Sequence, residues 1–539
     1  MNEMNKQAVS AAEIALKGFN SKPTSLLSYQ SNGRVLVLGN EQSLNFCKGF
    51  TQPLNIIFLL MTGSSKTLDI ENVLSLNQRS IDIQGHLGNF KITLTDAQGV
   101  TDFIEVDLIL DLNTDALIKL EIPPLGYVHE SNTDDNQQEI QDRLVDLTGE
   151  FEKPKYFNYN AEICAHGVNG KTVCTNCIEA CPAGAITSLV EKIKVDAYLC
   201  QGGGTCATVC PSGAIQYAYP RLSDSGNQIR LMLKAFRESG GEHAVVLFHA
   251  EEELNAELAP NYLPIKVEEI ASVGMELCLS TLVYGASQVV LLVNNDVPQL
   301  SLKNINQQLD WLQTLLMGLG LKPLMVTLQK HPNEVMPVKD LVSLEPAFYS
   351  MPDNKRQALF QALDHLYQQI EKTRELVSLP AGAPFGSASI DENSCTLCMA
   401  CVGSCPGKAL QDGSNREVPE ILFIESNCIQ CGTCTHTCPE QAISISPRFI
   451  FNREKRNQSR VLNQDTPFGC ITCGKPFAPT SVIQKMSHQL KDHYMFKTTR
   501  ALDRLKMCDD CRVADIVQDP EAVNGNIDPL RSASSETLS

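Results

Sequence analysis

Hydrophobic residues in the first quarter of the chain gather in short runs that predict β-strands. The runs are rich in Val, Ile and Leu, follow a helical leader, and lie at 34–39, 54–61, 80–85, 90–95 and 106–112. They predict a compact, mostly β or mixed α/β domain over residues 1–128. The acidic and polar stretch that follows, residues 129–160, predicts a connector.

A later region alternates between strand-like and helix-like patterns. Strand-like runs lie at 243–249, 285–293 and 323–328, and helical patterns lie at 267–284, 302–318 and 355–377. This alternation predicts a small parallel α/β domain over residues 221–377. The Pro, Gly and Ser content of residues 378–389 then predicts a linker.

The number and grouping of the cysteines indicate the chemistry of the chain. The chain has 21 cysteines in 539 residues, and 19 of them fall within 164–210, 395–438 and 470–511. In a reducing compartment such density indicates metal binding before disulfides. The two outside these blocks, Cys47 and Cys278, are more typical of small buried residues than of nucleophiles.

The block at 390–450 holds two complete runs of the spacing Cys-x2-Cys-x2-Cys-x3-Cys-Pro. In this motif three thiolates wrap one face of an iron–sulfur cluster, and the fourth cysteine binds the other cluster. The spacing therefore predicts a regular dicluster ferredoxin module with two 4Fe-4S clusters. Their ligand sets are Cys395, Cys398, Cys401 and Cys438 for one cluster, and Cys405, Cys428, Cys431 and Cys434 for the other.

The block at 161–220 is an irregular copy of the same module, so the chain carries an internal duplication. Its leading cysteine, Cys164, is separated from Cys174 by nine residues, where the regular run has two. By the same crossing rule, a third cluster takes the four cysteines Cys164, Cys174, Cys177 and Cys210. His166 is an alternative ligand to Cys164, although a loop histidine is more often a hydrogen-bonding residue.

The fourth cluster site lacks one cysteine. In "CQGGGTCATVCP" (200–211), Gly203 stands where the regular run has its second cysteine. Cys181, Cys200 and Cys206 remain, and three thiolates suit a 3Fe-4S cluster or a 4Fe-4S cluster with one open iron. An empty, decayed site is the alternative.

The block over 451–513 contains two Cys-x2-Cys pairs separated by 34 residues. Four thiolates in two such pairs, Cys470, Cys473, Cys508 and Cys511, are typical of a structural zinc site, with mononuclear iron of the rubredoxin type as the alternative. The last residues, 514–539, have the composition of a disordered tail.

Charge and hydropathy limit the partners. The net charge of -18 disfavours nucleic acid and anionic membranes, although residues 441–512 hold 13 Lys and Arg against 6 Asp and Glu. No run of 18 apolar residues predicts a membrane span, and the first residues do not resemble a signal peptide, so we expect a cytoplasmic protein. The turn-like "MTGSSKT" (61–67) lacks the frame of a phosphate-binding loop.

The cysteine-rich segments resemble known families. "CTLCMACVGSCP" with "CIQCGTCTHTCP", and "CTNCIEACP" with "CQGGGTCATVCP", resemble bacterial 4Fe-4S polyferredoxins. The segment at 265–293 is similar in pattern to the small α/β domain of methyl-viologen-reducing hydrogenase delta subunits, without their cysteines. The whole arrangement, with "GHLGNFKITL", "DLILDL" and "CAHG", is similar to large cytoplasmic iron–sulfur proteins encoded beside formate dehydrogenases. That resemblance implies electron exchange with such an enzyme or a role in its maturation.

Together these patterns predict an α+β multidomain electron carrier rather than an enzyme, because no nucleophile, carboxylate pair or nucleotide loop stands out. A redox protein, with formate dehydrogenase as the example, is the expected partner. The rival hypotheses are an accessory or maturation factor with structural or sensory clusters, and a nucleic-acid-binding protein that uses the basic C-terminal region.

Overall fold

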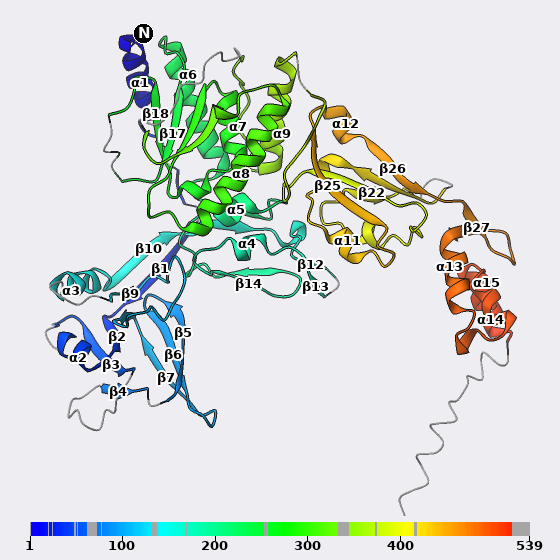
Figure 1. The fold of residues 1–539 in the computed structure, drawn as a ribbon, viewed down its shortest axis with the longest axis horizontal. Coiled ribbons are helices and arrows are strands. Elements are labelled where there is room, and N and C mark those ends of the chain that lie inside the picture. Colours follow the sequence, from blue (N-terminus) through cyan, green and yellow to red (C-terminus); the bar gives the residue numbers. More distant parts are fainter. Residues whose placement is uncertain are drawn as a thin grey trace, which may run out of the picture. The chain divides into compact units, whose positions relative to one another are not determined.

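The computed structural model describes residues 2–519, apart from 20, 24, 48, 49, 51, 62–72, 77, 132–136, 169, 253, 255, 256, 333–343, 372, 373 and 414–417. The "MTGSSKT" turn falls almost wholly outside the described residues. The chain divides into two compact units, Met1–Pro380 and Ala381–Ser539, and each is described by itself (Figure 1).

The N-terminal domain is built on a five-stranded sheet in the order β4-β3-β2-β8-β9, in which every described pairing is parallel. A three-stranded antiparallel sheet, β5-β6-β7, accompanies it. The central strands are Val- and Leu-rich without alternation because both of their faces are covered. The elements are β1 (Leu26–Ser31), β2 (Arg34–Gly39), α2 (Glu41–Cys47), β3 (Asn55–Leu60), β4 (Val73–Ser75), β5 (Ser80–His86), β6 (Asn89–Thr95), β7 (Thr101–Val106), β8 (Leu108–Asp111) and β9 (Tyr127–His129).

The expected connector at 129–160 is largely part of this domain instead. Helix α3 (Gln137–Asp146) buries Ile140 and Leu144 in the same hydrophobic core as β2 and β8. Strand β10 (Gly149–Pro154) pairs antiparallel with β1 along its whole length. The acidic composition was misleading because Glu150 and Glu152 occupy the exposed alternate positions of a half-buried strand.

The helical leader, assigned by sequence to the N-terminal domain, packs elsewhere. Helix α1 (Asn2–Leu16) lies beside α6 (Leu222–Glu238) of the middle domain, as Figure 1 shows. Its Ala8 and Ala12 are fully buried, and the Asn5 side chain accepts a hydrogen bond of 2.9 Å from the Glu242 backbone N–H. Small residues on one face of α1 permit this close approach, which residue composition alone does not reveal.

The middle domain has a four-stranded parallel sheet in the order β18-β17-β19-β20. The sequence predicted three of these strands but missed β18, an edge strand with Pro264 at a position that breaks the usual pattern. The expected helices at 267–284 and 355–377 are shorter in the structure. The elements are β17 (Val245–His249), β18 (Tyr262–Lys266), α7 (Met275–Val283), β19 (Gln288–Leu292), α8 (Gln299–Gly318), β20 (Val326–Gln329), α9 (Lys355–Gln369) and β21 (Leu376–Ser378).

The first cysteine block forms a small module between these two domains in the sequence. Short helices α4 (Asn176–Glu179) and α5 (Thr205–Val209) each precede the last cysteine of a run. Three two-stranded ribbons complete it: β11 (Phe157–Tyr159) with β16 (Ile215–Tyr217), β12 (Gly167–Val168) with β13 (Lys171–Thr172), and β14 (Ile186–Ser188) with β15 (Ile193–Val195).

The second unit contains the regular module and a C-terminal segment. Strand β22 (Gly386–Ile390) begins inside the expected linker and pairs with β25 (Ile443–Ile450). Strand β26 (Ser459–Gln464) pairs with β24 (Glu420–Ile424), which also pairs with β23 (Leu410–Asp412), so the module extends beyond the expected boundary at 450. Its helices are α10 (Ala400–Gly403), α11 (Thr433–Thr437) and α12 (Arg453–Asn457).

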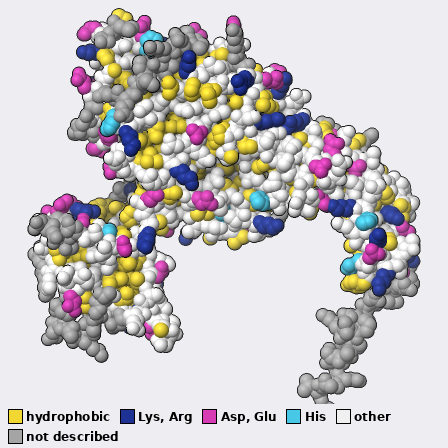
Figure 2. Space-filling view, in the orientation of Figure 1, with side chains coloured by type: hydrophobic (Ala, Val, Ile, Leu, Met, Phe, Trp, Pro, Cys, Tyr) yellow, Lys and Arg dark blue, Asp and Glu magenta, His cyan; other side chains and the backbone are white. Residues whose placement is uncertain are grey.

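The C-terminal segment has a short hairpin, β27 (Pro467–Gly469) and β28 (Pro476–Pro479), followed by α13 (Thr480–Leu490), α14 (Thr499–Arg504) and α15 (Asp509–Val517). Helix α15 covers the start of the expected tail at 514, and residues 520–539 lie outside the described residues. Within the described ranges, every helix is too short or too polar to cross a membrane. On the face drawn in Figure 2, acidic and basic side chains of the described residues are interspersed.

Candidate metal centres

The first ligand set of the regular module surrounds a hollow. One hollow is lined by Cys395, Cys398 and Cys401 of the first run and by Cys438 of the second run. Burial, with a smaller contribution from the neighbouring sulfurs of Cys395, Cys398 and Cys438, raises the pKa of Cys401 to about 12. Thiols held this way ionise readily only beside a cation, which fits an iron–sulfur cluster.

The second ligand set is likewise assembled from both runs. Burial raises the pKa of Cys434 to about 12, with the sulfurs of Cys431, Cys428 and Cys405 as its nearest electrostatic neighbours. Two sulfurs of this set accept hydrogen bonds. The Gln430 amide donates to Cys428 Sγ at 3.2 Å, and the Ala409 N–H donates to Cys405 Sγ at 3.3 Å. Such N–H···S bonds stabilise thiolate ligands and tune cluster potential.

A shared backbone conformation marks the loops that hold these cysteines. The residues on either side of the second cysteine of each run have positive φ: Leu397 (53°) and Met399 (61°) in one, and Gln430 (53°) and Gly432 (80°) in the other. Non-glycine residues seldom adopt this conformation. The strain is therefore a local signature of a loop wrapped around a cluster.

The irregular module brings together its own first set. One hollow is lined by all four cysteines of this set, Cys164, Cys174, Cys177 and Cys210. The nine residues between Cys164 and Cys174 contain the β12–β13 ribbon, and Cys164 stays close to Cys177 despite the altered spacing. Burial and a hydrogen bond with Cys164 raise the pKa of Tyr159 to about 12.

His166 does not take the place of Cys164. Its ring is 1 % exposed, and both nitrogens are engaged, Nδ1 at 2.7 Å from the Cys174 carbonyl oxygen and Nε2 at 2.7 Å from the Ser188 hydroxyl. The alternative of a histidine ligand is therefore wrong in this structure. His166 instead holds Cys174 in position.

The last set has three cysteines. Burial raises the pKa of Cys206 well above its ordinary value, and the sulfurs of Cys200 and Cys181 are its closest electrostatic neighbours. The loop repeats the backbone signature of the regular module, because Gly202 (φ 80°) and Gly204 (φ 75°) flank Gly203 as Gln430 and Gly432 flank Cys431. The loop therefore has the backbone conformation of the regular module's cysteine loops although its second cysteine is missing.

The three consecutive glycines of this loop differ in how much space a side chain would have. A Cβ at Gly204 would lie 2.6 Å from Ser272 Cα, and one at Gly202 would lie 3.0 Å from the Tyr156 ring. A Cβ at Gly203 would meet only Pro182 Cγ, at 4.0 Å, and its φ is not positive. Packing therefore does not exclude a cysteine at position 203.

Side chains of the N-terminal domain contact the segment that leads into this loop. The sequence did not predict these contacts. Lys153 Nζ on β10 donates to the carbonyl oxygens of Cys200, at 2.7 Å, and Tyr198, at 2.9 Å. Tyr29 on β1 donates its O–H to the Tyr198 carbonyl at 2.8 Å, and the His86 ring stacks on the Tyr198 ring at 4.4 Å. Burial lowers the pKa of Lys153 to about 8.

The four C-terminal cysteines also converge. The sulfurs of Cys470, Cys473, Cys508 and Cys511 all lie within 4.8 Å of one another, and those of Cys473 and Cys508 are 3.8 Å apart. Tetrahedral zinc with bonds near 2.3 Å places its sulfurs about 3.8 Å apart. Burial opposes ionisation of Cys470, but backbone N–H donors from Cys508, Cys473 and Thr472 outweigh it and lower its pKa to about 6. The donor set fits a metal.

The remaining two cysteines lie inside cores. Cys47 is 5 % exposed in the N-terminal domain, and burial raises its pKa to about 12. Cys278 on α7 is 2 % exposed, and burial raises its pKa further. Neither is placed as a reactive thiol.

Cysteine-lined hollows beside loops of repeated backbone conformation are typical of iron–sulfur domains of the ferredoxin type. In agreement, the family model described as a 4Fe-4S dicluster domain matches residues 394–443, and the model described as a 4Fe-4S binding domain matches residues 193–216. The second match spans the loop with Gly203. No curated protein matches the chain significantly. The chain therefore contains ferredoxin-type iron–sulfur domains, which indicate electron transfer.

Proposed function

We propose that the chain carries four iron–sulfur clusters and one zinc ion, and that it passes electrons to or from an oxidoreductase such as a formate dehydrogenase. Three clusters are of the 4Fe-4S type, and the cluster at Cys181, Cys200 and Cys206 is a 3Fe-4S cluster or a 4Fe-4S cluster with one open iron. Each cluster, when bound, takes up or releases one electron.

The observation that supports this proposal most directly is that each cysteine set takes cysteines from both runs of its module. In both modules each cysteine set combines thiols from two runs, so each pair of sites shares one small folded body. Adjacent one-electron sites in one module are suited to relaying electrons. The protein's own residues hold the cysteines in place and supply N–H donors to their sulfurs.

The test is anaerobic reduction of the purified, cluster-containing chain by formate and a catalytic amount of formate dehydrogenase, followed by EPR. We expect the EPR signals of reduced clusters to appear, and the rate of their appearance to increase with the concentration of the chain. A matched control is Cys431→Ser, which removes one thiolate from the regular module, compared with Cys278→Ser in the middle domain. If dithionite reduces the clusters but formate with the dehydrogenase does not, that enzyme is not the partner. Clusters that no reductant reduces would favour the accessory role.

A further inference from the structure

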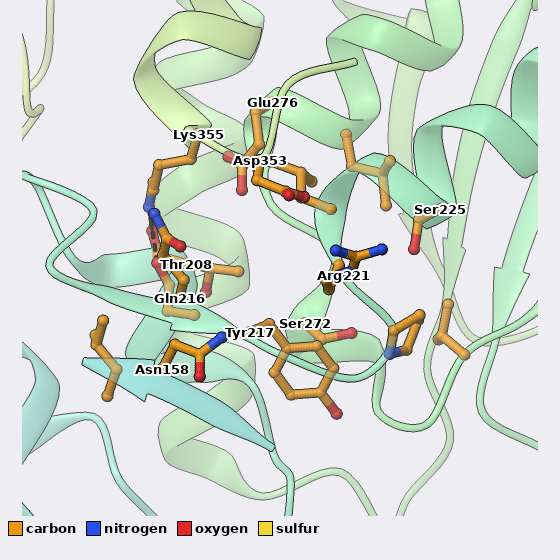
Figure 3. A pocket seen from close by; sticks show the side chains of 16 residues that line it. Asn158, Thr208, Gln216, Tyr217, Arg221, Ser225, Ser272, Glu276, Asp353 and Lys355 are labelled. Carbon is orange, nitrogen blue, oxygen red and sulfur yellow. Dashed lines mark hydrogen bonds between the residues drawn. The ribbon is translucent and has the colours of Figure 1, made fainter. Parts of the chain in front are cut away.

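A hollow that is partly open to solvent lies between the irregular cysteine module and the middle domain (Figure 3). The module contributes residues of β11, α5 and β16 to its wall, and the middle domain contributes the start of α6, the segment after β18, and the start of α7 and α9. The wall that follows β18 stands at the carboxyl end of a strand in a parallel sheet. Ligands of α/β folds commonly bind at this edge.

One buried carboxyl group in this wall has an oxygen without a partner. Glu276, in the first turn of α7, is 5 % exposed, and Figure 3 shows it at the hollow. Within the described residues its Oε2 is fully buried and makes no hydrogen bond. A buried carboxylate oxygen without a donor is costly, so native proteins seldom keep one without a reason.

The other charged groups of the hollow are already engaged. Arg221 pairs with Asp224 at 3.2 Å. Lys355 donates to the carbonyl oxygens of Ala207 and Thr208, both at 2.8 Å. The Asp353 carboxylate accepts the Ser223 backbone N–H at 3.0 Å. None of these contacts satisfies Glu276.

Carboxylates in and beside the hollow outnumber its two cations, Lys355 and Arg221, and Arg221 is already paired with Asp224. Glu268 and Glu269 act electrostatically on Tyr217, whose ring forms part of the wall, and Asp353 faces the same space as Glu276 in Figure 3. Apolar side chains of Ile215, Leu222 and Leu277 complete the lining. An occupant would therefore combine N–H donors on a cation with an apolar or aromatic body.

We propose that this hollow is a binding site for a small organic cation of the ammonium or amidinium class, whose N–H groups donate to Glu276. No cysteine lines the hollow, but it adjoins the cysteine module, because Ala207 and Thr208 lie between Cys206 and Cys210. The proposal does not depend on the identity of the redox partner.

The proposal is tested with three nearly isosteric probes that differ in charge. Benzamidine is a cation with a bidentate N–H edge, benzamide is neutral, and benzoate is an anion. Isothermal titration of the full, cluster-containing chain is expected to give a dissociation constant for benzamidine at least about tenfold lower than for benzamide, with no detectable binding of benzoate. Equal binding of the three probes, or none, would overturn the proposal and leave water as the partner of Oε2.

Two variants separate binding from folding. Glu276→Gln is expected to weaken benzamidine binding by about tenfold or more while the melting temperature stays the same or rises, because a buried charge is removed. The control Glu238→Gln changes an exposed residue at the end of α6 and should leave both unchanged. If Glu276→Gln lowers the melting temperature and leaves benzamidine affinity intact, Glu276 is a structural residue and the proposal fails.

Discussion

Lys153 Nζ lies 2.7 Å from the carbonyl oxygen of Cys200. The lysine belongs to a strand of the N-terminal domain, and the cysteine belongs to the set with only three thiols. The strand β10 that carries Lys153 pairs with β1, so a cation of the N-terminal domain is held against the backbone of a cysteine 47 residues further along the chain.

Lys153 is expected to raise the reduction potential of the three-cysteine cluster, because a nearby positive charge stabilises the more negative, reduced state. Lys153→Met should lower that potential by on the order of 50 mV at pH 7. EPR-monitored redox titration measures it. Lys153→Arg keeps the charge and should restore most of the potential, whereas Lys194→Met, an exposed change on β15, should have no effect. If the reduction potential is unchanged in Lys153→Met, the lysine only holds the loop in position and does not tune the cluster.

Gly203→Cys is expected to supply the missing thiolate without disturbing the loop, because the added Cβ meets only Pro182 Cγ at 4.0 Å. The oxidised protein should lose a three-iron EPR signal and gain about one iron per chain. Gly203→Ala, which adds the Cβ without sulfur, should keep the parent's signal. If the parent shows no three-iron signal and Gly203→Cys binds no extra iron, the three-iron assignment is wrong.

Cys508→Ser is expected to abolish zinc binding and to loosen the C-terminal segment, because Cys508 begins α15 and contributes one of the four sulfurs. Metal analysis should show the loss of about one zinc and unchanged iron, and limited proteolysis should cut within residues 465–519. Cys47→Ser, in the core of the N-terminal domain, serves as the control. Iron in place of zinc at this site in the parent would identify the rubredoxin-type alternative.

Asp107 is expected to stabilise the N-terminal domain. It is fully buried and accepts a bond of 2.7 Å from Arg34 Nη2. Burial opposes its ionisation, but the bonds from Arg34 and from the Asn32 N–H outweigh it and lower the pKa below the ordinary 3.8. A lowered carboxyl pKa adds stability above the unfolded pKa, and that stability is lost as pH falls through the folded value.

Asp107→Asn should therefore destabilise this domain by about 2 kcal/mol near neutral pH, since the half-exposed Arg34 is partly solvated without its partner. Hydrogen exchange of the β2 and β8 amides reports the change locally. The difference from the parent should shrink below about pH 4. Asp102→Asn, whose side chain is 63 % exposed, should have little effect, and a pH-independent difference would contradict the ion-pair explanation.

The regular cysteine runs could be predicted from the sequence because the cysteines of each run lie within a few residues of one another, and the motif itself predicts that the fourth cysteine binds the other cluster. Strands such as β2 and β3 were predictable for the same reason, since their apolar runs are continuous. The parallel order of the sheet was not, because it depends on pairings such as Val35 with Leu108.

The parts that the sequence did not reveal depend on long-range packing. Composition placed β10 in a connector, although its alternate positions pack and Lys153 reaches Cys200. Helix α1 carries no signal that points to α6 beyond its two buried alanines. Glu276 lies in a helical run that reads as an ordinary core helix, and only the fold shows that its carboxyl group lines a hollow.

A reductive titration of the anaerobically purified chain, with iron and acid-labile sulfide measured on the same sample, tests the central claim most directly. Four one-electron clusters predict uptake of about four electrons per chain, with about 15 or 16 irons bound. Uptake of two electrons or fewer with about 8 irons would contradict it, because only the regular module would then hold clusters.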